Sequence, residues 1–238
     1  MYNVAVLIPT YNRAQIVRHA ILQFKSNAFL DGSIRFYVTV DGTDDTMQVL
    51  QKLTSDHSMD IRIMPGARML GRKLNGYLGT NLNTLVSTAM ADGFEYLFQM
   101  DDDHILLKPM YLNPHCNKLA SDESAGWIRL MGVGAHKYTA DLEGSYWKIR
   151  WDSGECYIPS NRPHLKHIRF IKLFGLYPEN KKLGETEEGY CHKCIDIAKA
   201  YKEESKDMKL LPHVLVPLGF DTESSWDHIG DSWQLKGE

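Results

Sequence analysis

Apolar runs and helix-like patterns alternate along the first hundred residues of the chain. Strands are predicted where apolar residues follow one another in short runs, and helices where they recur every three or four positions. The pattern predicts strands at residues 4–8, 36–40, 61–64 and 94–100, and helices at residues 12–24, 47–53 and 81–90. This alternation predicts an α/β protein with a mostly parallel sheet flanked by helices.

Polar side chains follow three of these predicted strands, at the point where each strand ends. Thr10, Tyr11, Asn12 and Arg13 follow the first, Asp41 follows the second, and Asp101, Asp102 and Asp103 follow the fourth. Ligands of such sheets bind beyond the carboxyl ends of the strands, so we expect one polar crevice there. The turn at residues 41–46 is also expected to supply capping side chains to the helix at 47–53.

The second half of the chain is less regular and rich in aromatic residues. A helix is predicted at about residues 187–202, followed by a polar tail. The aromatic residues suit either stacking on a sugar or packing in the core of a mixed sheet, and the sequence leaves both interpretations open. They are Trp127, Tyr138, Tyr146, Trp147, Trp151 and Tyr157.

Composition places the 238 residues among globular proteins, since 43% are hydrophobic and 24% are charged. The net charge of −3 leaves binding to nucleic acid or to an anionic membrane dependent on a local basic patch. Residues 161–172 are the candidate, either as a surface for an anionic acceptor, such as a polysaccharide or a nucleic acid, or as an ordinary solvated face. Their basic and histidine residues are Arg162, His164, Lys166, His167, Arg169 and Lys172.

Two further features of the sequence are its possible targeting segments and the spacing of its cysteines. The apolar run near residue 4 is too short to span a membrane and lacks the features of a signal peptide, so a cytoplasmic protein without an integral membrane segment is expected. Cys191 and Cys194 form a single CxxC pair, while Cys116 and Cys156 stand alone. Reduced, partly buried thiols are therefore expected rather than a zinc site or a disulfide framework.

The three consecutive aspartates are the strongest chemical signal. If the backbone stays extended after the strand, Asp101 and Asp103 point to one side and Asp102 to the other. Crowded carboxylates repel one another, so such a cluster usually holds a hard cation. Oxygen ligands with open positions predict Mg²⁺ or Mn²⁺ bound together with a diphosphate.

Five segments in order resemble the inverting family-2-type glycosyltransferases of GT-A fold. They are VLIPTYNR, VDGTDDT, LFQMDDDH, residues 78–83 (LGTNLN) and residues 184–193 (GETEEGYCHK). The resemblance covers most of the chain. It implies a single GT-A domain over residues 1–238, with a Rossmann-like nucleotide-sugar-binding half at 1–104 and a mixed acceptor-binding half at 105–238.

The resemblance also implies roles for individual residues. The nucleotide of a donor, most often a UDP-sugar, would contact residues after the strands, and Asp41 would accept a hydrogen bond from its base. Asp103 and Asp101 would bind the metal, with His228 as a further ligand and His213 as the alternative. The nucleotide-binding residues would be Pro9, Thr10, Tyr11, Arg13, Asp41, Asn81, Asp101 and Asp102, and Arg72 or Lys73 would contact the diphosphate.

The catalytic base is expected in the segment that begins the predicted second-half helix. Sugar transfer needs a carboxylate that takes the proton of the acceptor hydroxyl, and one base with one metal suffices for inversion. Glu188 occupies the place of the family's usual aspartate, and Glu187 is the next candidate. Alternatively, Glu185, Glu187 and Glu188 only favour the helix N-terminus through its dipole.

The function expected from these observations is metal-dependent transfer of a sugar to the hydroxyl of a saccharide acceptor. Two alternatives remain: a nucleotidyltransferase that makes nucleotide sugars, and a non-catalytic module that binds them. The first usually carries a glycine-rich loop after the first strand, whereas residues 9–13 contain no glycine. Donor sugar, acceptor and oligomeric state do not follow from the sequence.

Overall fold

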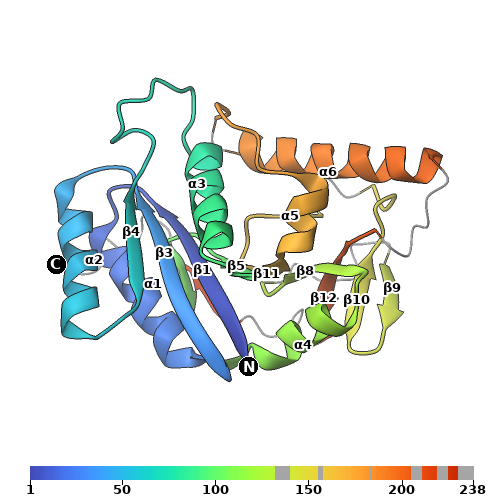
Figure 1. The fold of residues 1–238 in the computed structure, drawn as a ribbon, viewed down its shortest axis with the longest axis horizontal. Helices are drawn as coiled ribbons and strands as arrows, with labels where there is room; N and C mark the ends of the chain where they lie inside the picture. Colours follow the sequence, from blue (N-terminus) through green and yellow to red (C-terminus); the bar gives the residue numbers. More distant parts are fainter. Residues whose placement is uncertain (132–139, 155–157, 183, 205–210, 219–224, 230–238) are drawn as a thin grey trace.

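The computed structural model describes residues 1–131, 140–154, 158–182, 184–204, 211–218 and 225–229 (Figure 1). The strands are β1 (Tyr2–Thr10), β2 (Ala28–Phe29), β3 (Gly32–Val40), β4 (Ile61–Pro65), β5 (Tyr96–Gln99), β6 (His104–Leu106), β7 (Met110–Tyr111), β8 (Ala125–Arg129), β9 (Ala140–Glu143), β10 (Tyr146–Ile149), β11 (His164–His167), β12 (His213–Pro217) and β13 (Trp226–His228). The helices are α1 (Ala14–Asn27), α2 (Asp44–Asp56), α3 (Leu78–Ala91), α4 (Asn113–Ser121), α5 (Ile168–Phe174) and α6 (Glu185–Glu203).

One nine-stranded sheet runs through the molecule in the order β4-β3-β1-β5-β11-β8-β12-β10-β9. The first four strands are parallel, as the sequence pattern predicts. Beyond them the sheet is mixed, because β11 runs antiparallel to both β5 and β8, and β12 runs parallel to β8. The predicted fold class is therefore confirmed: a parallel half continues into a mixed half, and the two meet where β11 pairs with β5.

Helices cover both faces of this sheet, which explains why its first strand is apolar at successive positions (Figure 1). Val4, Val6 and Ile8 of β1 pack in one hydrophobic cluster with residues of α1, α2 and α4. Ala5 and Leu7 point to the other face and pack with residues of α3, α5 and α6. A strand buried on both sides has no polar position to alternate with.

The strands and helices predicted in the first half are present, most of them a few residues longer than their apolar patterns. Capping of α2 differs from the expectation, because Thr43 at its N-terminus makes no capping bond with its own side chain. Instead, the side-chain oxygen of Asn12 accepts the backbone N–H of Thr43 at 2.8 Å. A Cβ atom on Gly42 would lie 2.1 Å from that oxygen, so a larger residue at position 42 would displace the Asn12 side chain from this contact.

In the second half, only α6 was expected, and its aromatic residues divide between core and partly buried positions. Trp127 and Trp151 belong to the core, and the Trp127 ring stacks on His164 with centroids 3.7 Å apart. The core interpretation is therefore correct for these two. Tyr146 and Trp147 on β10 are partly buried, and Tyr138 and Tyr157 lie outside the described residues.

Two further findings concern the state of the cysteines and the ability of the helices to span a membrane. Cys116, Cys191 and Cys194 are buried and form no disulfide, while Cys156 lies outside the described residues. In the described part of the chain, every helix is too short or too polar to cross a membrane.

The fold is expected to lose stability in acid through its buried histidines. His115 on α4 lies 3.0 Å from the Tyr146 hydroxyl, and burial lowers its pKa from 6.5 to about 4. The unfolded chain therefore takes up a proton on this histidine first, and stability falls as the pH drops from 6.5 towards 4. This one residue contributes up to roughly 3 kcal/mol to the loss.

Replacing His115 by Gln keeps a polar group beside Tyr146 but removes the titration. Urea unfolding of both proteins at pH 7, 5.5 and 4.5 is expected to give a free energy of unfolding that falls less steeply for His115→Gln. The exposed His57→Gln is the control and should match the parent protein. Equal slopes for His115→Gln and the parent would contradict the assignment.

Candidate active site

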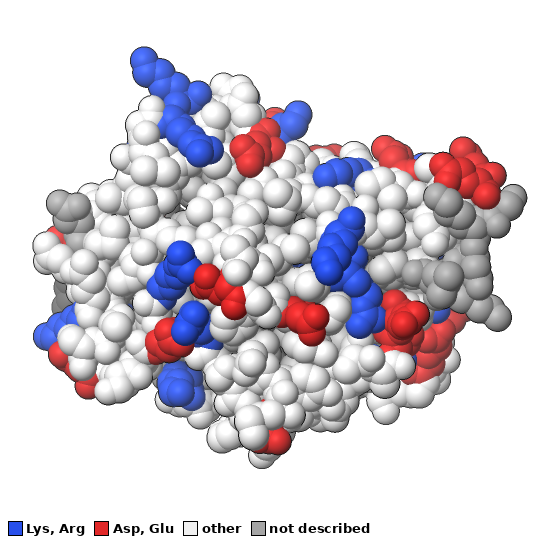
Figure 2. Space-filling view, in the orientation of Figure 1, with Lys and Arg blue, Asp and Glu red and all other residues white. Residues whose placement is uncertain are grey.

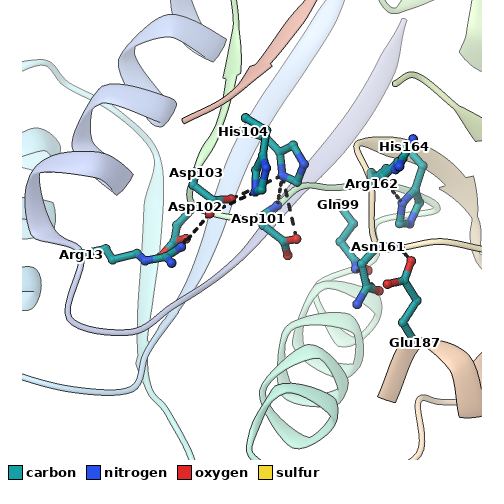
Figure 3. A network of polar contacts seen from close by, with 11 residues as sticks. Arg13, Gln99, Asp101, Asp102, Asp103, His104, Asn161, Arg162, His164 and Glu187 are labelled. Carbon is teal, nitrogen blue, oxygen red and sulfur yellow. Dashed lines mark hydrogen bonds and ion pairs between the residues drawn. The ribbon is translucent and has the colours of Figure 1, made fainter. Parts of the chain in front are cut away.

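The chain turns sharply just after β5, where the three aspartates stand. The backbone N–H of His104 donates to the carbonyl of Asp101 at 3.3 Å and closes the turn. The backbone is therefore not extended here, and the alternation of carboxylates that an extended backbone would give does not apply. Asp102 and Asp103 instead point to the same partner, and one Arg13 nitrogen donates to both, at 2.9 and 2.8 Å (Figure 3).

The end of β1 completes this corner because β1 and β5 are neighbours in parallel register, with Leu7 opposite Gln99. Thr10 is three residues after Leu7 and Asp102 is three residues after Gln99, and the Thr10 hydroxyl donates to Asp102 at 2.6 Å. Asp102 and Asp103 are buried by these contacts, whereas 34% of the Asp101 side chain remains accessible. Asp101 is thus the most accessible of the three carboxylates, although it is itself partly buried.

Two histidines stand beside Asp103. Antiparallel pairing of β6 with β13 sets His104 directly opposite His228, and their rings stack with centroids 5.0 Å apart. His228 Nε2 lies 3.3 Å and His104 Nδ1 3.8 Å from Asp103 oxygens. Within the described residues, Asp103, His104 and His228 form a group whose ligand atoms lie within 4.8 Å of one another. One carboxylate and two imidazoles can hold a divalent cation.

Electrostatics in this corner favour a neutral His104 imidazole and disfavour charge on the carboxylates of Asp101 and Asp102. Burial raises the pKa of Asp101 well above its usual range, and the charges of Asp103, Asp102 and Glu187 raise it further. Burial lowers the pKa of His104 to about 4, so its ring is neutral at pH 7 and its nitrogen can bind a metal. The accumulated negative charge would be relieved by a bound cation.

Asp41, at the end of β3, holds the loop that follows β4. One of its oxygens accepts the backbone N–H groups of Arg68 and Met69 at 2.7 and 3.3 Å, and the other accepts from the Asn81 side chain at 3.1 Å. Asn81 in turn accepts the N–H of Ala67 at 2.9 Å. Asp41 and Asn81 therefore shape the wall of the site together.

Arg68 on this loop is a site residue that the sequence did not single out. Its guanidinium lies between the rings of Tyr11 and Tyr77, 4.4 Å from each centroid. It is the first cation after the carboxyl end of β4, and that position was the available signal. Arg72 and Lys73, the cations expected at the diphosphate, lie further along the loop and are exposed.

These residues surround a cleft of about 550 Å³, a volume ordinary for a ligand site. Arg72 and Lys73 do not line it, and neither do Glu187, Glu188 or His213. The expected residues that do are Pro9, Thr10, Tyr11, Arg13, Asp41, Asn81, Asp101, Asp102, Asp103 and His228. The unexpected ones include Arg68, Tyr77 and Lys181.

Helix α6 brings one of its two candidate bases towards this cleft. Glu187 is partly buried, its Oε1 accepts the backbone N–H of Asn161 at 2.7 Å, and its charge acts on Asp101 (Figure 3). Glu188 is exposed. The difference follows from helix periodicity, because Tyr190, Cys191 and Cys194 lie three, four and seven positions after Glu187 and are buried.

The alternative ligand His213 lies elsewhere. It begins β12, where its ring is 6.4 Å from that of Trp151. Sequence order could not separate it from His228, because only the pairing of β13 with β6 brings a late histidine to the aspartates.

The basic segment at residues 161–172 is not a continuous charged surface, so neither interpretation offered for it applies to His164 and Lys166. His164 and Lys166 are fully buried. Arg169 donates to the backbone carbonyls of Leu119 and Asp122, at 2.6 and 2.8 Å. On the face in Figure 2, basic and acidic side chains lie interspersed. Nothing in the described residues supports a nucleic-acid acceptor.

Comparison with known proteins agrees with this architecture. The family model described as Glycosyl transferase family 2 matches residues 5–173. No curated protein sequence matches the chain.

Solved structures with a similar fold are distant in sequence. TarS 1–349 of S. aureus, also solved with UDP and with UDP-GlcNAc, has a TM-score of 0.62 and 15% identity, over 95% of this chain and 60% of that one. The mannosyltransferase PcManGT of Pyrobaculum calidifontis, with GDP-Man and Mn²⁺, has a TM-score of 0.56 and 13% identity, over 91% and 58%. A Drosophila β-1,4-galactosyltransferase 7 mutant, with manganese, UDP-Gal and xylobiose, has a TM-score of 0.53 and 12% identity, over 99% and 74%. The chain thus spans about three fifths of the length of the first of these.

Proposed function

Because the chain belongs to glycosyl transferase family 2, we propose that it transfers a sugar from a nucleotide-sugar donor to the hydroxyl of a saccharide acceptor. One observation carries the proposal. The cleft at the carboxyl ends of β1, β3 and β5 places an accessible carboxylate beside a cluster able to hold a cation, with a further carboxylate on α6 nearby. A donor diphosphate, a metal and a base would each find matching chemistry there.

The donor is proposed to bind along the wall formed by Pro9, Thr10 and Tyr11, with Arg68 beside its negative charge. Asp41 and Asn81 would act mainly by holding the loop that carries Arg68. UDP is the proposed nucleotide. Residues 1–104 would supply most donor contacts and residues 105–238 the acceptor side, within one domain.

The cation is proposed to be held by Asp103, His104 and His228, with Asp101 contacting it or the diphosphate. The donor set favours Mn²⁺ over Mg²⁺, since Mg²⁺ prefers oxygen ligands whereas a transition metal such as Mn²⁺ also accepts imidazole nitrogen. When bound, the cation would offset the charge that develops on the departing diphosphate. Arg13 would keep Asp102 and Asp103 close together by donating to both.

The base is proposed to be Glu187. Asn161 binds one of its oxygens through a backbone N–H, which leaves the other to accept the proton of the attacking hydroxyl. Attack opposite the departing diphosphate would invert the anomeric centre without a covalent intermediate. Glu188, at the family's usual base position, is exposed.

The first test is donor turnover. With Mn²⁺ present, UDP-GlcNAc, UDP-Gal and GDP-Man are offered separately, and the released nucleoside diphosphate is measured. We expect release from a UDP-sugar that stops when the cation is chelated, and a loss of about 100-fold or more in Asp103→Ala. Asp45→Ala, an exposed carboxylate on α2, is the matched control and should keep full activity.

Other outcomes separate the alternatives. UDP binding without release from any donor would favour a non-catalytic module. Formation of UTP from a UDP-sugar and pyrophosphate would favour a nucleotidyltransferase. Release at the parental rate by Asp103→Ala would refute the metal site.

The base assignment is tested by Glu187→Gln and Glu188→Gln, which remove one charge each at neighbouring positions. We expect kcat to fall about 100-fold or more in Glu187→Gln and to change less than threefold in Glu188→Gln, because general-base catalysis contributes factors of that order. UDP affinity, measured by calorimetry, should be the same in both. The reverse pattern would assign the role to Glu188.

A further inference from the structure

Lys166 on β11 is fully buried between aromatic rings, which is an unusual place for a lysine. Its Nζ lies 4.9 Å from the centroids of both Trp127 and Tyr177. Among the described residues, no carboxylate lies within ion-pairing distance of it. Burying an ammonium group without a carboxylate partner costs free energy, whereas a methionine of similar length would fill the space without that cost. The lysine therefore has to provide something that methionine lacks.

The partners of Lys166 are two neutral groups. Nζ donates to Gln99 Oε1 at 2.8 Å and to the Tyr177 hydroxyl at 2.9 Å. Burial lowers the pKa of Lys166 to about 7, so near neutral pH it is partly the uncharged amine. A neutral amine keeps two N–H groups, which equals the number of bonds made here. The contacts therefore persist in either protonation state.

These contacts fix the orientation of the Gln99 amide. Its Oε1 accepts from Lys166 and also from the Tyr177 hydroxyl at 2.9 Å. Two donors can meet only the oxygen of an amide, so the NH₂ group must face the other way. There Nε2 donates to Asn161 Oδ1 at 3.3 Å.

Asn161 carries the chain of contacts to the proposed base. It is buried in the segment before β11, and its backbone N–H donates to Glu187 Oε1 at 2.7 Å. Figure 3 shows Gln99, Asn161 and Glu187 close together, each from a different part of the fold. A buried lysine on β11 is thereby linked to the carboxylate at the start of α6 through two side chains.

We propose that Lys166 is a positioning residue for the transfer reaction: by fixing the Gln99 amide, it holds Asn161 where the Asn161 N–H binds one oxygen of Glu187. The inference rests on the proposed function, in which Glu187 is the base. It assigns a purpose to a buried cation that contacts neither donor nor metal site. Methionine could fill the space but supplies neither N–H group.

A double-mutant cycle tests this proposal. Lys166→Met is made in the parent and in Glu187→Gln, and diphosphate release is followed with whichever of UDP-GlcNAc, UDP-Gal and GDP-Man the parent turns over fastest. We expect Lys166→Met to lower kcat about 10-fold in the parent, with UDP affinity changed less than twofold, and to cause no further loss in Glu187→Gln. Lys172→Met, an exposed lysine on α5, is the control and should leave kcat unchanged.

A lysine with a purely structural role would give a different result. An equal fold-loss of kcat in both backgrounds, or an unchanged kcat in the parent, would overturn the proposal while leaving the base assignment intact. If Glu187→Gln itself keeps parental turnover, the base assignment fails and this inference fails with it. Should Lys166→Met not fold, Asn161→Ala breaks the same link and takes its place in the cycle.

Discussion

The structure depends on crowding three carboxylates where β5 ends, at the centre of the sheet. Like charges at this distance repel one another, and burial of Asp102 and Asp103 removes water that would weaken the repulsion. Thr10 and Arg13 compensate part of that cost with short hydrogen bonds. The compensation is incomplete, because the pKa values of both Asp101 and Asp102 remain raised, and a corner with that imbalance is suited to a cation.

The position of β5 explains how one corner can serve two substrates. On one side it pairs with β1, whose end supplies Thr10 and the wall of the cleft. On the other side it pairs with β11, and the segment before β11 contacts α6 through Asn161 and Glu187. The strand thus joins the parallel half, proposed to hold the donor, to the mixed half, proposed to hold the acceptor. Gln99, its last residue, faces the second of these.

Much of the donor side could be predicted from sequence because it depends on local rules. Polar residues directly after buried parallel strands must meet at one edge, and Thr10, Arg13, Asp41 and Asp103 do. His104 was adjacent to the aspartates but is oriented by a turn and by pairing with β13, which is remote in sequence. The position of Arg68 depends on a loop folded around Asp41, and the hydrophobic periodicity of a sequence does not predict loop conformation.

The acceptor side was less predictable for a related reason. Its strands are short, mixed in direction and paired out of chain order, so no simple period marks them. Lys166 and His164 looked like surface residues because charge usually indicates exposure, yet both lie in the core. Helical periodicity around Tyr190 and Cys194 was the one signal that could have favoured Glu187 over Glu188 as the inward-facing residue.

The most direct test of the central claim is anomalous diffraction at the manganese edge from crystals soaked with Mn²⁺ and UDP. The account predicts one strong peak bounded by Asp103, His104 and His228, with the diphosphate of UDP beside it in the cleft. A nucleotide bound elsewhere, with no manganese peak at this corner, would contradict it.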